Sequence, residues 1–193
     1  MLKKLQSLKA KKGFTLVELI VVIAIIAVLA AILVPTMLGY VTSSRVTSAD
    51  STAASLKDTI GNAMVETDTK GFKVPRSGSI TVTLGGTSAD PTVAMKNSDD
   101  SDASYPELIT AIEDKIKNDY NFTKEFAAIV YIDGGKVVGC AYCADSGAND
   151  DLTSIAATDF TSGSTSLWTD TDGIMGDYVV GTSPKLIKDT TTS

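Results

Sequence analysis

The longest feature in the hydrophobic pattern is a mostly apolar run near the N-terminus, from Phe14 to Val34. These 21 residues would measure about 32 Å as an α-helix, close to the hydrocarbon core of a bilayer, about 30 Å thick. The run also exceeds the apolar core of an ordinary secretory signal peptide, which has about 7–15 residues. The pattern therefore predicts a membrane-spanning helix over residues 14–35.

A second helical pattern continues directly from the first, with apolar residues on one face only. Through residues 36–66 they recur at steps of three and four, at Val46, Ala49, Ala53, Leu56, Ile60 and Ala63. This spacing predicts the amphipathic half of the same helix, with one stripe packed on a folded domain. Pro35 removes a backbone donor and Gly39 weakens the same stretch, so we expect a kink there.

Residues 67–193 show the shorter patterns of an exported globular domain. Residues 67–71 have the composition of a turn that ends the long helix. Apolar and threonine side chains alternate over residues 80–84, which predicts a half-buried strand. Residues 85–104 are polar, and we expect them to form a loop.

A short amphipathic helix is expected after this loop. Ser104 is its expected N-cap, and Pro106 suits the first turn because proline needs no hydrogen-bond acceptor there. The apolar positions of the helix are Leu108, Ile109, Ile112 and Ile116.

A β-hairpin is expected next, with strands over residues 127–132 and 136–140 joined by Asp-Gly-Gly at 133–135. Residues 144–176, rich in Ser, Thr, Asp and Gly, are expected to be mainly loop, and residues 177–181 to form a last strand. Together these patterns predict an α+β architecture, in which a long N-terminal α-helix packs on a small antiparallel β-sheet.

Charge is distributed unevenly along the chain. The first 13 residues contain five lysines and no acidic residue, whereas residues 14–193 hold 12 Lys+Arg against 23 Asp+Glu, a formal net charge of −11. The basic start places the N-terminus in the cytoplasm and the remainder outside. The acidic body argues against nucleic acid as a partner of the isolated subunit.

Glu18 is a single charged residue inside the predicted span. A carboxylate in the middle of a membrane helix costs roughly 2.5–3.5 kcal/mol by insertion scales, and such residues usually have a specific partner. We expect no residue between Phe14 and Pro35 to be that partner. We therefore expect the partner to come from outside this segment.

The border between Gly13 and Phe14 suggests where that partner arises. Cleavage there would create an α-amine on Phe14, which is cationic below a pKa of about 7.7–8.0. Glu18 lies four residues on, about 6 Å along a helix axis. In a stack of chains with a small axial offset, the amine of one copy could pair with Glu18 of the next.

The segment Gly13-Phe14-Thr15-Leu16-Val17-Glu18, with a lysine-rich leader before it and an apolar helix after it, resembles the type III signal of type IV pilins and type II secretion pseudopilins. The resemblance covers about residues 7–35, and Pro35 matches a position where this family often has proline. It implies a cleaved leader over residues 1–13. It also implies that a membrane prepilin peptidase cuts between Gly13 and Phe14 and N-methylates Phe14.

The resemblance further implies a structural protein with no enzymatic activity, and we expect neither a cofactor nor a metal site. Its partners would be further copies of the chain in a helical filament, the prepilin peptidase and the pilus assembly platform. The precursor would cross the cytoplasmic membrane once, with its N-terminus inside. The mature subunit would then join an extracellular pilus on the cell surface.

Cys140 and Cys143 are the two cysteines of the chain. Export permits a disulfide, but residues i and i+3 of a regular strand point to opposite faces. A bridge would therefore require the strand to end in a turn near Ala141 and Tyr142. The sequence leaves two possibilities open, a short structural disulfide or two separate thiols.

Other candidate chemistry is sparse. The chain has no histidine, which excludes a histidine base or imidazole metal ligand. Acidic clusters at 99–102, 149–151 and 170–173 could bind calcium, but none fits an EF-hand loop, and they are interpreted as solvated loop residues. Asn121-Phe122-Thr123 has the form of an N-glycosylation sequon, to which the sequence alone assigns no role.

Three functions are compatible with these patterns. The first is a type IV pilus subunit, and the second is a pseudopilin of a type II secretion or competence DNA-uptake system. The third is a membrane-anchored extracellular enzyme or binding domain that never polymerises. The size of the exported body favours a pilin, and the third function leaves Glu18 unexplained.

Overall fold

The computed structural model describes residues 13–169 and 172–189. The chain divides into two compact units, residues 1–42 and 43–193. Helix α1 (Leu16–Thr69) begins in the first unit, and all other elements belong to the second, called the body below. Of the predicted leader, residues 1–12 lie outside the described part of the chain.

Within the body, α1 buries the predicted apolar stripe. All six predicted positions are buried, and Met64 and Thr67 join them. The helix ends at Thr69 because Gly71 adopts a left-handed φ of 84°. The amide of Phe72 then donates to the Thr67 carbonyl at 3.1 Å, and that of Gly71 to the Asp68 carbonyl at 2.9 Å, which caps the helix end.

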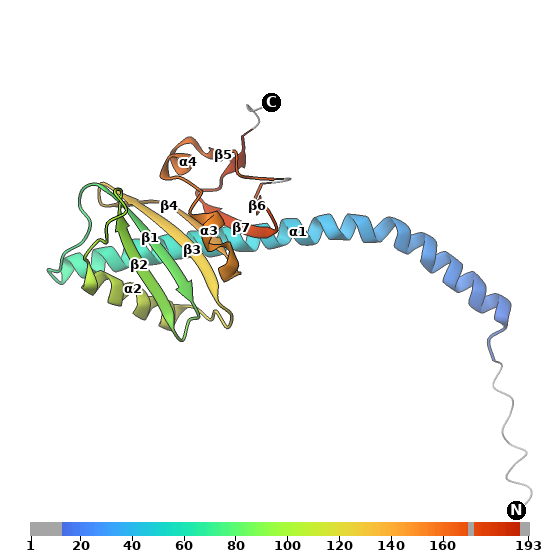
Figure 1. Cartoon of the computed structure of the whole chain (residues 1–193). Coiled ribbons are helices and arrows are strands. Elements are labelled where there is room, and N and C mark those ends of the chain that lie inside the picture. Colours follow the sequence, from blue (N-terminus) through green and yellow to red (C-terminus); the bar gives the residue numbers. More distant parts are fainter. Residues whose placement is uncertain (1–12, 170–171, 190–193) are drawn as a thin grey trace, which may run out of the picture. The chain divides into compact units, whose positions relative to one another are not determined.

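A six-stranded antiparallel sheet forms the centre of the body (Figure 1). Its spatial order is β2-β1-β3-β4-β7-β6. The strands are β1 (Ser79–Gly86), β2 (Pro91–Asn97), β3 (Phe126–Asp133), β4 (Lys136–Cys143), β6 (Ile174–Met175) and β7 (Tyr178–Ser183). This sheet and the long helix confirm the predicted α+β architecture.

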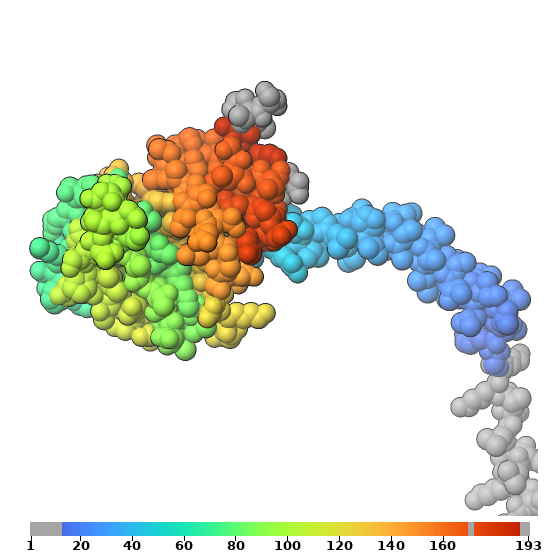
Figure 2. All heavy atoms as spheres, in the orientation of Figure 1, coloured from blue at the N-terminus to red at the C-terminus, as the bar shows by residue number. Residues whose placement is uncertain are grey.

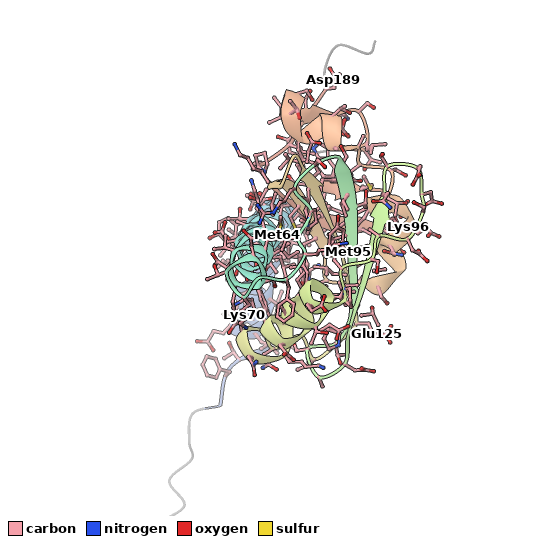
Figure 3. The ribbon with its side chains drawn as sticks, turned by 90° about the vertical axis from the view of Figure 1, so that its left-hand side faces the viewer. Met64, Lys70, Met95, Lys96, Glu125 and Asp189 are labelled. Atoms are coloured by element: carbon pink, nitrogen blue, oxygen red, sulfur yellow. The ribbon has the colours of Figure 1, made fainter. Side chains whose placement is uncertain are left out.

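Each face of the sheet has its own core. On one face α1 and α2 (Pro106–Asp119) pack on the strands, in a cluster that includes Met64 of α1 and Met95 of β2, both labelled in Figure 3. β3 alternates between the two cores: Val130 belongs to this cluster, whereas Ile129 belongs to the opposite one. The central strands are therefore buried on both sides.

The second core lies under a lobe formed by the C-terminal third of the chain, drawn in orange and red in Figure 2. Trp168 is almost fully buried there, and its indole N–H donates to the Leu186 carbonyl at 3.1 Å. The lobe contains η2 (Ser146–Ala148), α3 (Asn149–Leu152), α4 (Ala157–Ser162) and a parallel pair of short strands, β5 (Ser164–Thr165) and β8 (Ile187–Lys188). Residues 144–176, expected to be mainly loop, therefore also hold short helices and strands.

Several sequence predictions are confirmed by these elements. β1 includes the strand expected over residues 80–84, and β7 overlaps the one expected over 177–181. The β3–β4 hairpin turns at Gly134 and Gly135, whose φ values of 55° and 81° suit a two-residue turn. β4 nevertheless runs on to Cys143, three residues beyond its predicted end.

Two predictions near α2 were wrong. Ser104 is not its N-cap, because Tyr105 occupies that position without a side-chain capping hydrogen bond, although Pro106 does lie in the first turn. Residues 91–97 form the edge strand β2 inside the expected loop over 85–104. The more buried positions of β2 (91, 93, 95 and 97) alternate with exposed ones, although only Pro91 and Met95 are fully buried.

Candidate processing and assembly site

The start of α1 is closed by a reciprocal pair of side chains. The carboxylate oxygen Oε2 of Glu18 accepts hydrogen bonds from the Thr15 backbone N–H at 2.8 Å and from the Thr15 hydroxyl at 2.7 Å. In return, the Glu18 backbone N–H donates to Thr15 Oγ1 at 3.2 Å. This is a capping box, which satisfies backbone donors that have no partner within the helix.

The capping box corrects the sequence analysis of Glu18. No opposite charge lies in the apolar segment, as the sequence indicates, but Thr15 provides two neutral donors. The signal was present as Thr-x-x-Glu immediately before an apolar run, which is the sequence form of a capping box. Within the described residues, the carboxylate is thus held at a defined position by neutral donors and makes no ion pair.

The bond between Gly13 and Phe14 lies just outside this cap. Residues 13–15 have no regular secondary structure, and α1 begins at Leu16. Phe14 is 87% exposed, and a Cβ added to Gly13 would have no atom within 4 Å. The described part of the chain therefore leaves this bond open to a peptidase.

From Leu16 to Val41 the large hydrophobic side chains of α1 are exposed, at 45–78% of their surface. This is the one helix of the described residues that is long and apolar enough to cross a membrane. A shallow apolar groove on it, of about 370 Å³, is lined by Val21, Ala24, Ile25, Val28 and Leu29. A continuous apolar surface of this kind requires lipid or other apolar helices as its surroundings.

Pro35 lies inside α1, which remains helical through it and through Gly39. The hydroxyl of Thr36 donates to the Leu33 carbonyl at 2.9 Å, and that of Thr42 donates to the Leu38 carbonyl at 3.2 Å. These bonds give carbonyls of the proline-containing stretch additional donors without help from water. The kink expected at Pro35 stays a prediction.

Residues 8–34 match the family model of the prokaryotic N-terminal methylation motif. The chain carries the processing signal of type IV pilins and pseudopilins. No curated protein and no solved structure shows significant similarity to it.

This prepilin-type signal explains how the features of the site belong together. The matched residues include the Gly13–Phe14 bond, the capping box and most of the exposed apolar helix. The motif implies processing by a prepilin peptidase, and the apolar helix indicates a membrane-anchored precursor. Proteins of this type are typically structural subunits without enzymatic activity.

The two cysteines of this prepilin-type chain lie on opposite faces of β4. Cys140 belongs to the core under α1 and α2, whereas Cys143 belongs to the core under the C-terminal lobe. Both are buried free thiols. Of the two possibilities that the sequence leaves open, the structure therefore has separate thiols, because β4 continues through Ala141 and Tyr142 without a turn.

We expect thiol titration to give no reaction in the native protein and two thiols per chain after denaturation without reductant. Burial raises the pKa of both thiols, so little of the reactive thiolate is present near neutral pH. Cys140→Ala should give one thiol under the same denaturing conditions. Thiols that appear only after a reductant is added would instead establish the disulfide.

Several carboxylates of the acidic clusters make hydrogen bonds or ion pairs within the body. Asp99 accepts a hydrogen bond from the Ser101 N–H at 3.0 Å, and Asp100 pairs with Lys96 at 2.7 Å. Asp172 accepts from the Lys188 N–H at 2.6 Å, whereas Asp170 lies outside the described residues. Among residues 13–169 and 172–189, no group of three His, Cys, Asp or Glu side chains could hold a metal ion.

Proposed function

We propose that the protein is a structural subunit of a type IV pilus and polymerises through its N-terminal helix. The observation that carries the proposal is the exposed apolar helix with a fixed carboxylate at its start. The helix is anchored in the membrane before assembly and is buried among the helices of other subunits afterwards. Helices of other subunits can take the place of lipid around this surface, because both surroundings are apolar.

Processing supplies a positively charged partner for Glu18. Cleavage between Gly13 and Phe14 leaves a cationic amine on Phe14, one residue before Thr15. The Glu18 carboxylate is held 2.8 Å from the Thr15 amide nitrogen, so its position at the start of α1 is defined before a neighbouring subunit arrives. N-methylation keeps this amine basic.

Assembly then replaces a local cap by a pair between subunits. A capping interaction is worth about 1 kcal/mol, whereas breaking one side of a buried ion pair costs about 3–5 kcal/mol. The Phe14 amine of one subunit pairs with Glu18 of the next, which fixes the axial position of each helix. Only a processed subunit carries this amine, so an uncleaved precursor does not join the filament.

A pseudopilin of a secretion or DNA-uptake system carries the same motif and helix, so it is the alternative. The two functions differ in the length and location of the polymer. Electron microscopy of filaments sheared from the cells, with mass spectrometry of their subunit, separates them. Long surface filaments made of this chain support the pilus, and their absence at normal expression supports the pseudopilin.

The mature protein is expected to begin at Phe14, with an N-methyl group on its amine. Gly13→Leu should block cleavage, because the small residue before the bond is what the peptidase accepts. Within the described part of the chain a Cβ added at Gly13 has no atom within 4 Å, so a loss of cleavage reports on the peptidase. Mass analysis of the N-terminal peptide measures the result.

Gly39→Leu is the matched control for this experiment. Gly39 is equally open, with no atom within 4 Å of an added Cβ, but it lies 26 residues beyond Gly13. This variant should be cleaved normally. An N-terminus at Met1 in the surface form of the wild-type protein would contradict the proposed processing.

A further inference from the structure

The connection between α2 and β3 holds the N-glycosylation sequon of the chain. Of the five asparagines in the sequence, Asn121 alone is followed two residues later by Ser or Thr, with a residue other than proline between them. Residues 120–125 have no regular secondary structure, and Tyr120 is extended, with φ −122° and ψ 157°. Glu125, labelled in Figure 3, marks the point where the connection meets β3.

Two aromatic residues of this segment anchor it to the body. The Tyr120 hydroxyl lies 2.9 Å from the Ser55 hydroxyl and 2.8 Å from the Thr59 hydroxyl on α1. The Phe122 N–H donates to Ser88 Oγ at 2.6 Å, and the Phe122 carbonyl accepts from the Ser88 N–H at 3.1 Å. The Phe122 ring also packs against Phe126, with centroids 4.3 Å apart.

Asn121 and Thr123 alternate with these two aromatic residues and face the solvent. Tyr120 and Phe122 are half-buried, whereas Asn121 and Thr123 are exposed. In an extended segment, residues i and i+2 lie on the same side, so the amide and the hydroxyl of the sequon face outward together. Neither side chain makes a hydrogen bond or an ion pair with another described residue.

We propose that Asn121 is an N-glycosylation site of the exported subunit, with a lipid-diphosphate-linked oligosaccharide as the sugar donor. This proposal rests on the proposed function, because export of the subunit brings the body to the outer side of the membrane. An oligosaccharyl transferase on the outer side of the membrane binds the Thr123 hydroxyl and the Asn121 amide, which lie on the same side of the segment. The bulky, hydrated product needs a surface position, which this segment provides.

The reaction is a group transfer without oxidation or reduction. A bond forms between Asn121 Nδ2 and C1 of the first sugar, and the bond from C1 to the phosphate oxygen of the donor breaks. The lipid diphosphate leaves with the bonding electron pair. The amide nitrogen loses one proton to a base of the transferase.

The test is mass spectrometry of the mature protein taken from the cells that produce it. Trypsin cuts after Lys117 and Lys124, so one peptide, residues 118–124, contains the whole sequon. We expect this peptide to carry sugar residues on Asn121 and the intact protein to exceed its sequence mass by the same amount. Asn121→Gln and Thr123→Ala should each abolish the added mass.

Two conservative variants serve as controls. Thr123→Ser keeps the hydroxyl and should retain the glycan. Asn118→Gln changes an exposed asparagine of the same peptide, whose amide donates to the Asp114 carbonyl within α2, and should also retain it. All four changes are at exposed positions, so the body is expected to fold in each.

The outcomes separate this site from the proposed function. Mature protein that begins at Phe14 but has an unmodified Asn121 overturns the glycosylation site and leaves the pilus subunit intact. Added mass on residues 118–124 that persists in Thr123→Ala also overturns the site. A protein with its leader uncleaved and Asn121 unmodified contradicts both proposals.

Discussion

Glu18→Gln is expected to abolish filament formation while the membrane-bound subunit stays at its normal level. Glutamine can still accept the two hydrogen bonds from Thr15, so the start of α1 is preserved. It carries no charge, so the amine of a neighbouring Phe14 would enter the apolar helix bundle unpaired. A cost of about 3–5 kcal/mol lowers the affinity of each subunit contact by at least about a hundredfold.

Thr15→Ala is the matched control, because it removes the hydroxyl of the cap and keeps the charge of Glu18. It should cost about 1 kcal/mol at the helix start and leave the filament yield near that of the wild type. The measurement compares membrane-bound subunit with sheared filament for each variant. Normal filaments from Glu18→Gln together with reduced filaments from Thr15→Ala would show that Glu18 acts as a cap and would refute the pairing.

Glu18→Ala removes both the cap and the charge. It should lower the filament yield as strongly as Glu18→Gln does. The membrane-bound pool should stay level or rise, because an unpaired carboxylate is removed from the apolar segment. The body should fold unchanged, because Glu18 lies in the first of the two units.

Gly181→Ala is expected to destabilise the body strongly. Gly181 lies in β7, and a methyl group there would overlap the backbone of Ala49 and Asp50 in α1. β7 cannot move away from α1 freely, because the backbone N–H of Thr182 donates a hydrogen bond to Asp50 Oδ1 at 2.9 Å. Since neither backbone can move aside cheaply, we expect the free energy of unfolding to fall by about 3 kcal/mol or more.

Gly61→Ala is the control, and it is expected to raise the free energy of unfolding instead of lowering it. Gly61 lies in the interior of α1, and an added Cβ would make only an ordinary contact with Val137, at 4.0 Å. Alanine should stabilise the helix there by about 1 kcal/mol. Urea unfolding of residues 43–193 measures both variants, and equal midpoints for Gly181→Ala and wild type would contradict the predicted clash.

Local patterns predicted much of the fold because they depend on neighbours in the sequence. The apolar stripe of α1 follows from helical periodicity, and each of its six positions is buried. The β3–β4 turn follows from two glycines that can adopt positive φ. β2 was missed because it is an edge strand that begins with proline and fully buries only two side chains. Its strand conformation becomes evident from its pairing with β1 in the folded sheet.

The candidate site was also predicted mainly from local sequence. Gly13, Phe14 and Glu18 lie within six residues, and the family model matches the same region. The interaction of Glu18 with Thr15 was missed because a carboxylate in an apolar segment was expected to pair with a charged group. A carboxylate near a helix start can instead be held by a hydroxyl and a backbone N–H three residues before it.

By itself, the sequence determined the processing signal, the apolar helix and the α+β class, because each depends on residue types at fixed short spacings. The tertiary structure alone decided which face of β4 each cysteine occupies, how closely β7 approaches α1, and that Asn121 and Thr123 face outward together. Trp168 shows the reason, since its burial depends on Leu186, 18 residues later. Contacts between distant segments form only when the cores pack, and no local periodicity encodes them.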